Sequence, residues 1–193
     1  MKEIKFTVFA DLHYRKGMYI PSVEDMDSII DSADKNGSDL VVHLGDMCND
    51  YIGSKELINA YLNNKHGLSV YGIYGNHELE SENNSMPVVT PMLTNRDVIW
   101  GTADGKIGDG SIGYYYFDTN GFRFVMTDTN YSYNPQKDIW EHNVTCSYGP
   151  PHGNTHICAL GPVQLKWLDD VLCDAAEKSF RCIVCSHMSF SKM

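Results

Sequence analysis

Leu40-Val-Val-His-Leu-Gly-Asp46 decides the fold, because it is an apolar run that ends abruptly in a glycine and a carboxylate. A short apolar run between turn signals is typical of a strand buried in a sheet. Similar runs lie on either side of it, at Ile4–Val8 and at Leu68–Ile73, and a helical pattern separates each run from the next. This β-α-β-α-β order predicts a parallel sheet with right-handed crossovers.

The two helices between these strands have recognisable ends. The first begins at Ser22, with Asp25 three residues later in the pattern of a capping box, and stops at Gly37. The second is capped by Ser54 and is expected to end at Gly67. Both helices are therefore predicted as the crossovers of the parallel sheet.

The second half of the chain is rich in aromatic residues and adds antiparallel strands. The runs Tyr114–Phe117 and Phe122–Met126 are joined by the turn Asn120-Gly121, and Asn-Gly between β-formers is a strong hairpin signal. The segment Tyr131–Leu160 has little periodicity. We expect it to be a long loop, and loops of that length are usually functional or disordered.

A helix and a strand are predicted after this loop. The helix begins at Pro162, and its buried face is expected to consist of apolar residues, namely Leu165, Leu168, Val171, Leu172, Ala175 and Ala176. The strand Phe180–Cys185 contains a C-x-x-C pair, Cys182 and Cys185. Because side chains alternate along a strand, these thiols should face opposite sides, which favours core packing over a redox or zinc site.

The composition indicates one globular, soluble domain over residues 1–193. Of these residues 42% are hydrophobic, which is enough for a core. The formal charge of −10 argues against a broad nucleic-acid surface, which needs Lys and Arg to neutralise phosphates. No signal core and no run of about 18 apolar residues occurs, so we expect neither export nor a membrane span. Six cysteines without a disulfide spacing fit reduced thiols in a cytoplasmic protein.

Polar side chains that a core would exclude follow four of the predicted strands. They are Asp11 and His13 after the first strand, Asp46 after the second, Asn76, His77 and Glu78 after the third, and His187 after the last. Residues two apart in extended backbone point the same way, so Asp11 and His13 can meet one ion. In open α/β sheets ligands gather beyond the carboxyl ends of the strands, which is where all these groups are expected.

The order D-x-H, G-D, G-N-H-E and then a histidine at the end of a strand resembles the calcineurin-like metallophosphoesterases. Each motif alone is a weak signal, and their order and their positions after strands carry the resemblance. It extends over essentially the whole chain. The resemblance implies an α/β fold, a sandwich of two mixed β-sheets flanked by helices.

The resemblance also implies a role for each polar residue. Asp11 and His13 would hold the first of two metal ions, Asn76 and His187 would hold the second, and Asp46 would bridge both. Mixed nitrogen and oxygen ligands of this kind accept Mn, Fe, Zn or Ni, so the identity of the metals stays open.

His77 and Glu78 are expected to serve catalysis and not to bind metal. The resemblance implies that His77 approaches the phosphate and stabilises the transition state or protonates the leaving oxygen, while Glu78 orients His77. Two divalent ions outweigh the carboxylates Asp11 and Asp46, which gives an acidic protein a positive site for phosphate. The functional hypothesis is hydrolysis of a small phosphate mono- or diester by a hydroxide that bridges the two metals.

The sequence departs from the family pattern at its end. The family's G-H-x-H motif, which supplies one histidine to each metal, does not occur after His187 or elsewhere. We therefore expect a domain truncated at its C-terminus, with an incomplete second sheet. The alternative is a non-catalytic metal-binding scaffold or inactive fragment that binds a protein partner. His152 and His156 could also swing in as substitute ligands, although surface positions explain them as well.

Other polar residues carry weaker signals. Asp128 follows a predicted strand and could lie behind the metal ligands, but a turn aspartate explains it equally well. Asn49 and Asp50 follow Asp46 closely and could line the site. His43 and His142 are interpreted as residues without a catalytic role, His43 in the core or flank of its strand.

Overall fold

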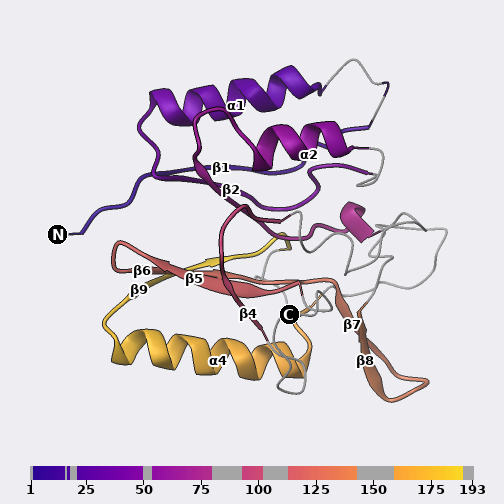
Figure 1. Ribbon diagram of the computed structural model, residues 1–193. Helices are drawn as coiled ribbons and strands as arrows, with labels where there is room; N and C mark the ends of the chain where they lie inside the picture. Colours follow the sequence, from indigo (N-terminus) through magenta and orange to yellow (C-terminus); the bar gives the residue numbers. More distant parts are fainter. Residues whose placement is uncertain are drawn as a thin grey trace.

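The computed structural model describes residues 2–15, 17, 21–49, 54–79, 93–101, 113–142 and 159–188. Over these residues two β-sheets stack on each other, with helices on both outer faces (Figure 1). The expected sandwich flanked by helices is therefore confirmed. No helix within these ranges is both long and apolar enough to cross a membrane.

The first sheet has the order β1-β2-β3, with strands Phe6–Phe9 (β1), Leu40–His43 (β2) and Ser69–Gly72 (β3). Both strand pairs are parallel. The crossover helices α1 (Val23–Lys35) and α2 (Lys55–Leu62) lie together on its outer face (Figure 1). The predicted β-α-β-α-β order is confirmed, although the strands described in this sheet are all parallel and not mixed.

Helix α1 begins as the sequence predicts. The Ser22 hydroxyl accepts a hydrogen bond from the Asp25 amide, and the Asp25 carboxylate accepts one from the Ser22 amide, which completes the capping box. The apolar stripe of the helix, Met26, Ile30 and Ala33, is buried. Gly37, with a φ of 68°, adopts the left-handed conformation that stops the helix.

Helix α2 ends at Leu62, several residues before Gly67, so the predicted end was wrong. The reason is the side chain of Asn64. Its amide group donates to the carbonyl of Tyr61, and its oxygen accepts from the amide of Leu68. These bonds replace the backbone bonds of a further helical turn and lead the chain directly into β3.

The second sheet is mixed and has the order β4-β5-β6-β9. Its strands are Ile99–Trp100 (β4), Tyr115–Thr119 (β5), Phe122–Met126 (β6) and Arg181–Cys185 (β9). Asn120 and Gly121 form the predicted hairpin turn, both with positive φ, which matches the twist of the strands. Cys182 is exposed and Cys185 is buried, as the alternation of β9 predicts.

A second hairpin lies where the sequence predicted a long loop. Strands β7 (Tyr131–Asn134) and β8 (Ile139–His142) pair antiparallel. Two aromatic cross-strand contacts, Tyr131 with His142 and Tyr133 with Trp140, support the pairing. The loop prediction was therefore wrong for this part of the segment. His152 and His156 lie outside the described residues.

Helix α4 (Pro162–Glu177) covers the outer face of the second sheet (Figure 1). Its buried residues are Gln164, Val171 and Ala175. Leu165 is 49% exposed and Ala176 is exposed, so the prediction of a purely apolar face was wrong there. Gln164 takes the buried position because its side chain bonds both the amide and the carbonyl of Asp128.

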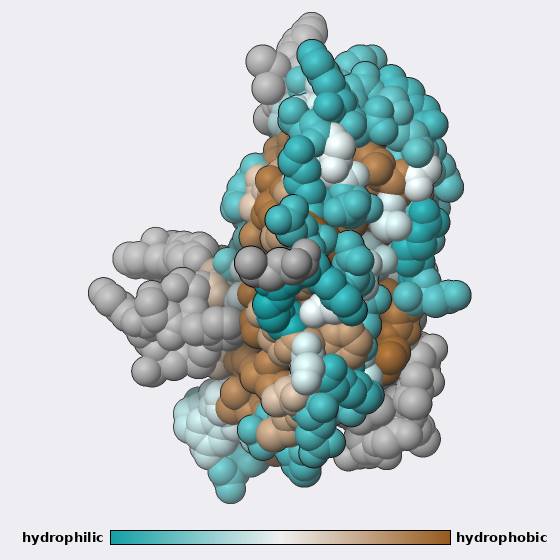
Figure 2. All heavy atoms as spheres, turned by 90° about the vertical axis from the view of Figure 1, so that its left-hand side faces the viewer, coloured by the Kyte–Doolittle hydropathy of each residue, from teal (hydrophilic) through white to brown (hydrophobic). Residues whose placement is uncertain are grey.

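The two sheets pack through aromatic rings. Tyr71 of β3 stacks on Phe117 of β5 with ring centroids 3.6 Å apart, and Phe6 of β1 contacts Phe124 of β6 edge to face at 5.1 Å. The Tyr115 hydroxyl joins the layers, because it donates to the carbonyl of Gly72 and accepts from its amide. On the end of the molecule that Figure 2 shows, hydrophobic atoms reach the surface mainly between the hydrophilic atoms at the top and the bottom, with some hydrophilic atoms among them. These contacts fix β1 and β3 relative to β5 and β6 of the second sheet.

Candidate metal centre

The loops that follow β1 and β2 are joined by backbone hydrogen bonds. The amide of Asp11 donates to the carbonyl of Gly45, and the amide of His13 donates to the carbonyl of Asp46. These bonds continue the pairing of the two strands beyond their ends. They bring the D-x-H and G-D motifs into contact, as the sequence predicted.

The carboxylate of Asp46 lies at the centre of the polar residues. Its Oδ2 atom is 3.5 Å from Nε2 of His187, 3.6 Å from Nε2 of His13 and 3.9 Å from Nε2 of His77. The Asp46 side chain is only 4% exposed. A single buried carboxylate oxygen therefore faces three imidazole nitrogens, which is the position expected of a bridging ligand.

Two overlapping groups of side chains could each hold an ion. One consists of His13, Asp46 and His77, and the other of Asp11, Asp46 and His187, with the candidate ligand atoms of each within 4.8 Å of one another. Asp46 belongs to both groups. The grouping differs from the expected one, because it puts Asp11 beside His187 and makes His77 a candidate ligand. The assignment of individual ligands therefore stays a prediction.

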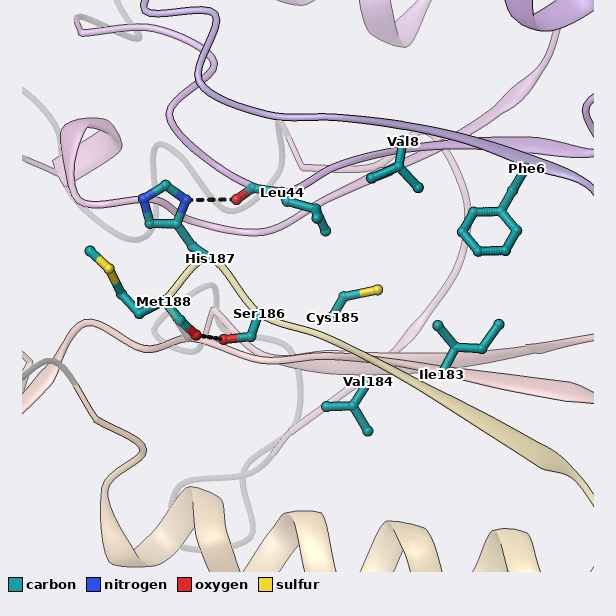
Figure 3. Close-up of a pocket in the computed structure, with 9 residues that line it drawn as sticks. All are labelled: Phe6, Val8, Leu44, Ile183, Val184, Cys185, Ser186, His187 and Met188. Atoms are coloured by element: carbon teal, nitrogen blue, oxygen red, sulfur yellow. Dashed lines mark hydrogen bonds between the residues drawn. The ribbon is translucent and has the colours of Figure 1, made fainter. Parts of the chain in front are cut away.

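His187 presents one ring nitrogen to this centre. Its Nδ1 lies 2.7 Å from the carbonyl oxygen of Leu44, which can only accept, so Nδ1 carries the hydrogen. Figure 3 shows this bond at one end of a groove between β1 and β9. Nε2 is left facing Asp46 and lies 3.3 Å from Oδ1 of Asn76. This geometry suits a histidine that binds metal through Nε2 next to an asparagine ligand.

The electrostatics of this pair favour a cation. Burial alone would lower the pKa of His187, but the hydrogen bond and charge of Asp46 outweigh it and raise that pKa to about 9. Burial likewise opposes the ionisation of Asp46, yet its contacts with His187 and with the amide of His77 lower its pKa. A positive charge is therefore stabilised between the two side chains. The donor set fits divalent metal ions, which compete with protons for such ligands.

The backbone around the site is strained at three positions. Asp11, His13 and Asp46 have φ values of 57°, 51° and 53°, in the left-handed region that residues other than glycine rarely adopt. Such conformations persist only where the surrounding structure holds them. Here the backbone bonds between the two loops do so.

Gly75 allows the third loop to approach Asp46. A Cβ atom on Gly75 would lie 1.9 Å from Oδ1 of Asp46 and 2.4 Å from its amide nitrogen. A larger residue would therefore push the G-N-H-E motif away from the G-D motif. Close approach of backbone is the role that glycine serves best.

Glu78 holds these two loops together. It lies in the short 3-10 helix η1 (His77–Leu79) and is fully buried. Its carboxylate accepts hydrogen bonds from the amides of Asp46, Met47 and Gly75. Burial and the charge of Asp46 raise the pKa of Glu78 to about 7, while the bonds from the amides act in the opposite direction. The predicted role of Glu78 in orienting His77 stays a prediction, and its visible contacts position Asp46.

Glu78→Gln is therefore expected to destabilise the fold. The change keeps the size of the side chain but replaces an acceptor oxygen by a donor, and a buried amide left without an acceptor costs about 1–3 kcal/mol. Urea denaturation of the metal-free protein measures the loss in unfolding free energy. Glu56→Gln is the matched control, because Glu56 is exposed and accepts one bond, from the Tyr14 hydroxyl. Equal stability of both variants and the wild type would contradict this role.

His77, which follows β3, is more exposed to solvent than His187, which follows β9. Its amide donates to Oδ1 of Asp46 at 2.9 Å, which anchors its backbone. Its side chain is 31% exposed, against 8% for His187. The ring contacts that of His13 edge to face, with centroids 4.6 Å apart. The imidazole of His77 is therefore accessible from outside while it lies beside His13 and Asp46.

The other candidates have different surroundings. Asn49 lies beside the site, with its Oδ1 atom 3.1 Å from Nδ1 of His13. Asp128 is fully buried and pairs with His142 at 2.8 Å, so neither is a simple surface residue. His43 is a core residue, as predicted, and burial lowers its pKa to about 3. Asp50 lies outside the described residues.

One buried residue of this region escaped the sequence analysis. Asn130 is 1% exposed, and its side-chain amide donates to the carbonyl of Gly75. The sequence signal that could have found it is the polar run Thr127–Asn130 directly after β6, all of which is buried. Four consecutive buried polar residues need hydrogen-bond partners, and such a run indicates a polar network.

Comparison with known proteins agrees with this fold. The sequence model of the family described as calcineurin-like phosphoesterase matches residues 4–189. Among solved structures, the crystal structure of a dimetal phosphatase from Danio rerio is similar, with a TM-score of 0.65 and 19% sequence identity. The match covers 97% of this chain and 70% of that one. A comparison with curated proteins found no match.

Proposed function

The chain belongs to the calcineurin-like phosphoesterase family, and we propose that it hydrolyses phosphate mono- or diesters at a two-metal site centred on Asp46. The observation that carries the proposal is the convergence of three histidine nitrogens on one buried oxygen of Asp46. A phosphate ester is the substrate class that the family implies. Two divalent ions held by these residues would give the acidic chain a positive site that attracts phosphate.

The proposed ligands are Asp11, His13, Asp46, Asn76 and His187. Bound ions would neutralise the phosphate oxygens and lower the pKa of the attacking water. Asp46 would keep the two ions close together, because both candidate groups contain it. The imidazole and carboxylate donors suit Mn, Fe, Zn or Ni, and the structure favours none of these.

His77 is proposed to act on the substrate. Its ring lies next to the ligand cluster and is partly exposed, so it can reach a phosphate oxygen or the leaving group. A protonated imidazole there would donate a hydrogen bond to the phosphate and then a proton to the leaving oxygen. Asp46 fixes the backbone of His77, which ties the position of this ring to that of the metals.

The test uses the purified chain, stripped of metal and then loaded with Mn²⁺, Zn²⁺, Fe²⁺ or Ni²⁺ in turn. Turnover of p-nitrophenyl phosphate and of bis-p-nitrophenyl phosphate would show activity on mono- and diesters, respectively. We expect metal-dependent release of nitrophenol that a chelator abolishes. A folded chain that binds these metals and turns over neither ester would contradict the proposal.

A further inference from the structure

Asn130 connects the second sheet to the loop that carries Asn76 and His77. Its side-chain amide lies 3.2 Å from the carbonyl oxygen of Gly75, the residue directly before Asn76. The same amide group lies 2.9 Å from Oδ1 of Asp128, and the backbone amide of Asn130 donates to that oxygen at 3.0 Å. Hydrogen bonds to Gly75 and to Asp128 therefore fix the orientation of the Asn130 side chain.

Asp128 is itself held by two different elements. Gln164 of α4 accepts from its amide at 2.9 Å and donates to its carbonyl at 2.7 Å. Oδ2 of Asp128 lies 2.8 Å from Nε2 of His142 in β8. A chain of hydrogen bonds thus runs from α4 and from the β7–β8 hairpin, through Asp128 and Asn130, to Gly75.

Gly75 needs such support. Glycine has no Cβ to restrict its backbone, so its peptide groups rotate more freely than those of other residues. Here Glu78 accepts from the amide of Gly75, and Asn130 donates to its carbonyl. The carbonyl belongs to the peptide that leads into Asn76, so its direction sets where the side chain of Asn76 starts.

We propose that Asn130 is a positioning residue of the metal centre, which fixes the peptide between Gly75 and Asn76 so that Asn76 and His77 face Asp46. It acts through Gly75 and touches neither metal nor substrate. The inference rests on the proposed two-metal function. Groups that orient metal ligands without binding the metal typically change affinity or activity about 10- to 100-fold when they are removed.

The test compares Asn130→Ala with Asn64→Ala. Asn64 is also buried, and its side-chain amide also donates two hydrogen bonds, in this case to the carbonyls of Tyr61 and Leu68. It lies before β3, at the opposite end of that strand from Gly75. Both variants should lose thermal stability. Only Asn130→Ala should weaken Mn²⁺ binding in calorimetric titration, by about 10- to 100-fold. Only this variant should change the visible absorption of the Co²⁺-loaded protein, which reports ligand geometry.

Three results would contradict the positioning role of Asn130. Wild-type Mn²⁺ affinity and an unchanged Co²⁺ spectrum in Asn130→Ala would overturn the inference and leave the proposed function intact. Equal losses of metal binding in Asn64→Ala would also overturn it, because they would reflect general destabilisation. A wild-type chain that binds no metal would refute the proposed function and the inference together. Should Asn130→Ala not fold, Asn130→Ser, whose hydroxyl is too short to reach Gly75, takes its place with the same criteria.

Discussion

Asp46→Asn is expected to reduce metal-dependent hydrolysis by more than about a hundredfold, because losses of that order already follow when groups that merely orient a ligand are removed. The variant keeps the size of the side chain, and its remaining oxygen can still accept from the His77 amide. It loses the negative charge and the second oxygen that a bridging ligand needs. The affinity for metal should therefore fall at both of the proposed metal positions.

Calorimetric titration with Mn²⁺ and initial rates with a nitrophenyl ester measure this effect. Asp39→Asn is the matched control, because Asp39 precedes β2 at the opposite end from Asp46 and accepts a bond from the Lys5 amide. It should bind metal and turn over substrate like the wild type. An Asp46→Asn protein that still binds two ions with wild-type affinity would refute the central position assigned to this carboxylate.

His77→Ala is expected to lower kcat by about 10²- to 10⁴-fold, the usual contribution of a general acid or base. If His77 acts on the substrate and not on the metals, Mn²⁺ affinity should remain that of the wild type. Steady-state kinetics and metal titration of the same preparation separate the two effects.

The same measurement decides whether His77 acts on the substrate or is itself a metal ligand. His66→Ala serves as the control, since the ring nitrogens of His66 contact the carboxylates of Asp31 and Asp34 on α1, away from the site. A parallel loss of Mn²⁺ affinity in His77→Ala would make His77 a ligand, as its closeness to His13 and Asp46 permits. Unchanged kcat with unchanged metal binding would leave His77 without a role.

The sequence predicts the part of the fold that depends on local patterns. Alternation and apolar runs identify β1, β2 and β3, the capping box identifies the start of α1, and Asn120-Gly121 identifies the hairpin turn. The candidate site follows from the same reasoning. Polar residues at the carboxyl ends of strands in a parallel sheet share one edge, where Asp11, His13, Asp46 and Asn76 are found. His187 joins them from the end of β9, in the second sheet.

Features that depend on partners distant in sequence were not predictable in this way. Gln164 occupies a buried position of α4 because Asp128 needs its hydrogen bonds, and no periodic pattern reports such a need. The β7–β8 hairpin depends on aromatic pairs across short strands with little apolar alternation. Asn130 acts on Gly75 across the interface between the sheets, 55 residues away in sequence.

The left-handed backbone at Asp11, His13 and Asp46 sets a limit on engineering this protein. Glycine would relax each of these positions, and each strained residue costs on the order of 1–3 kcal/mol. A selection for thermal tolerance alone would therefore favour variants that remove three of the side chains proposed as metal ligands. Thermal stability and the proposed catalysis are therefore in conflict at these loops. A mutant library selected for stability should keep Asp11, His13 and Asp46 unchanged.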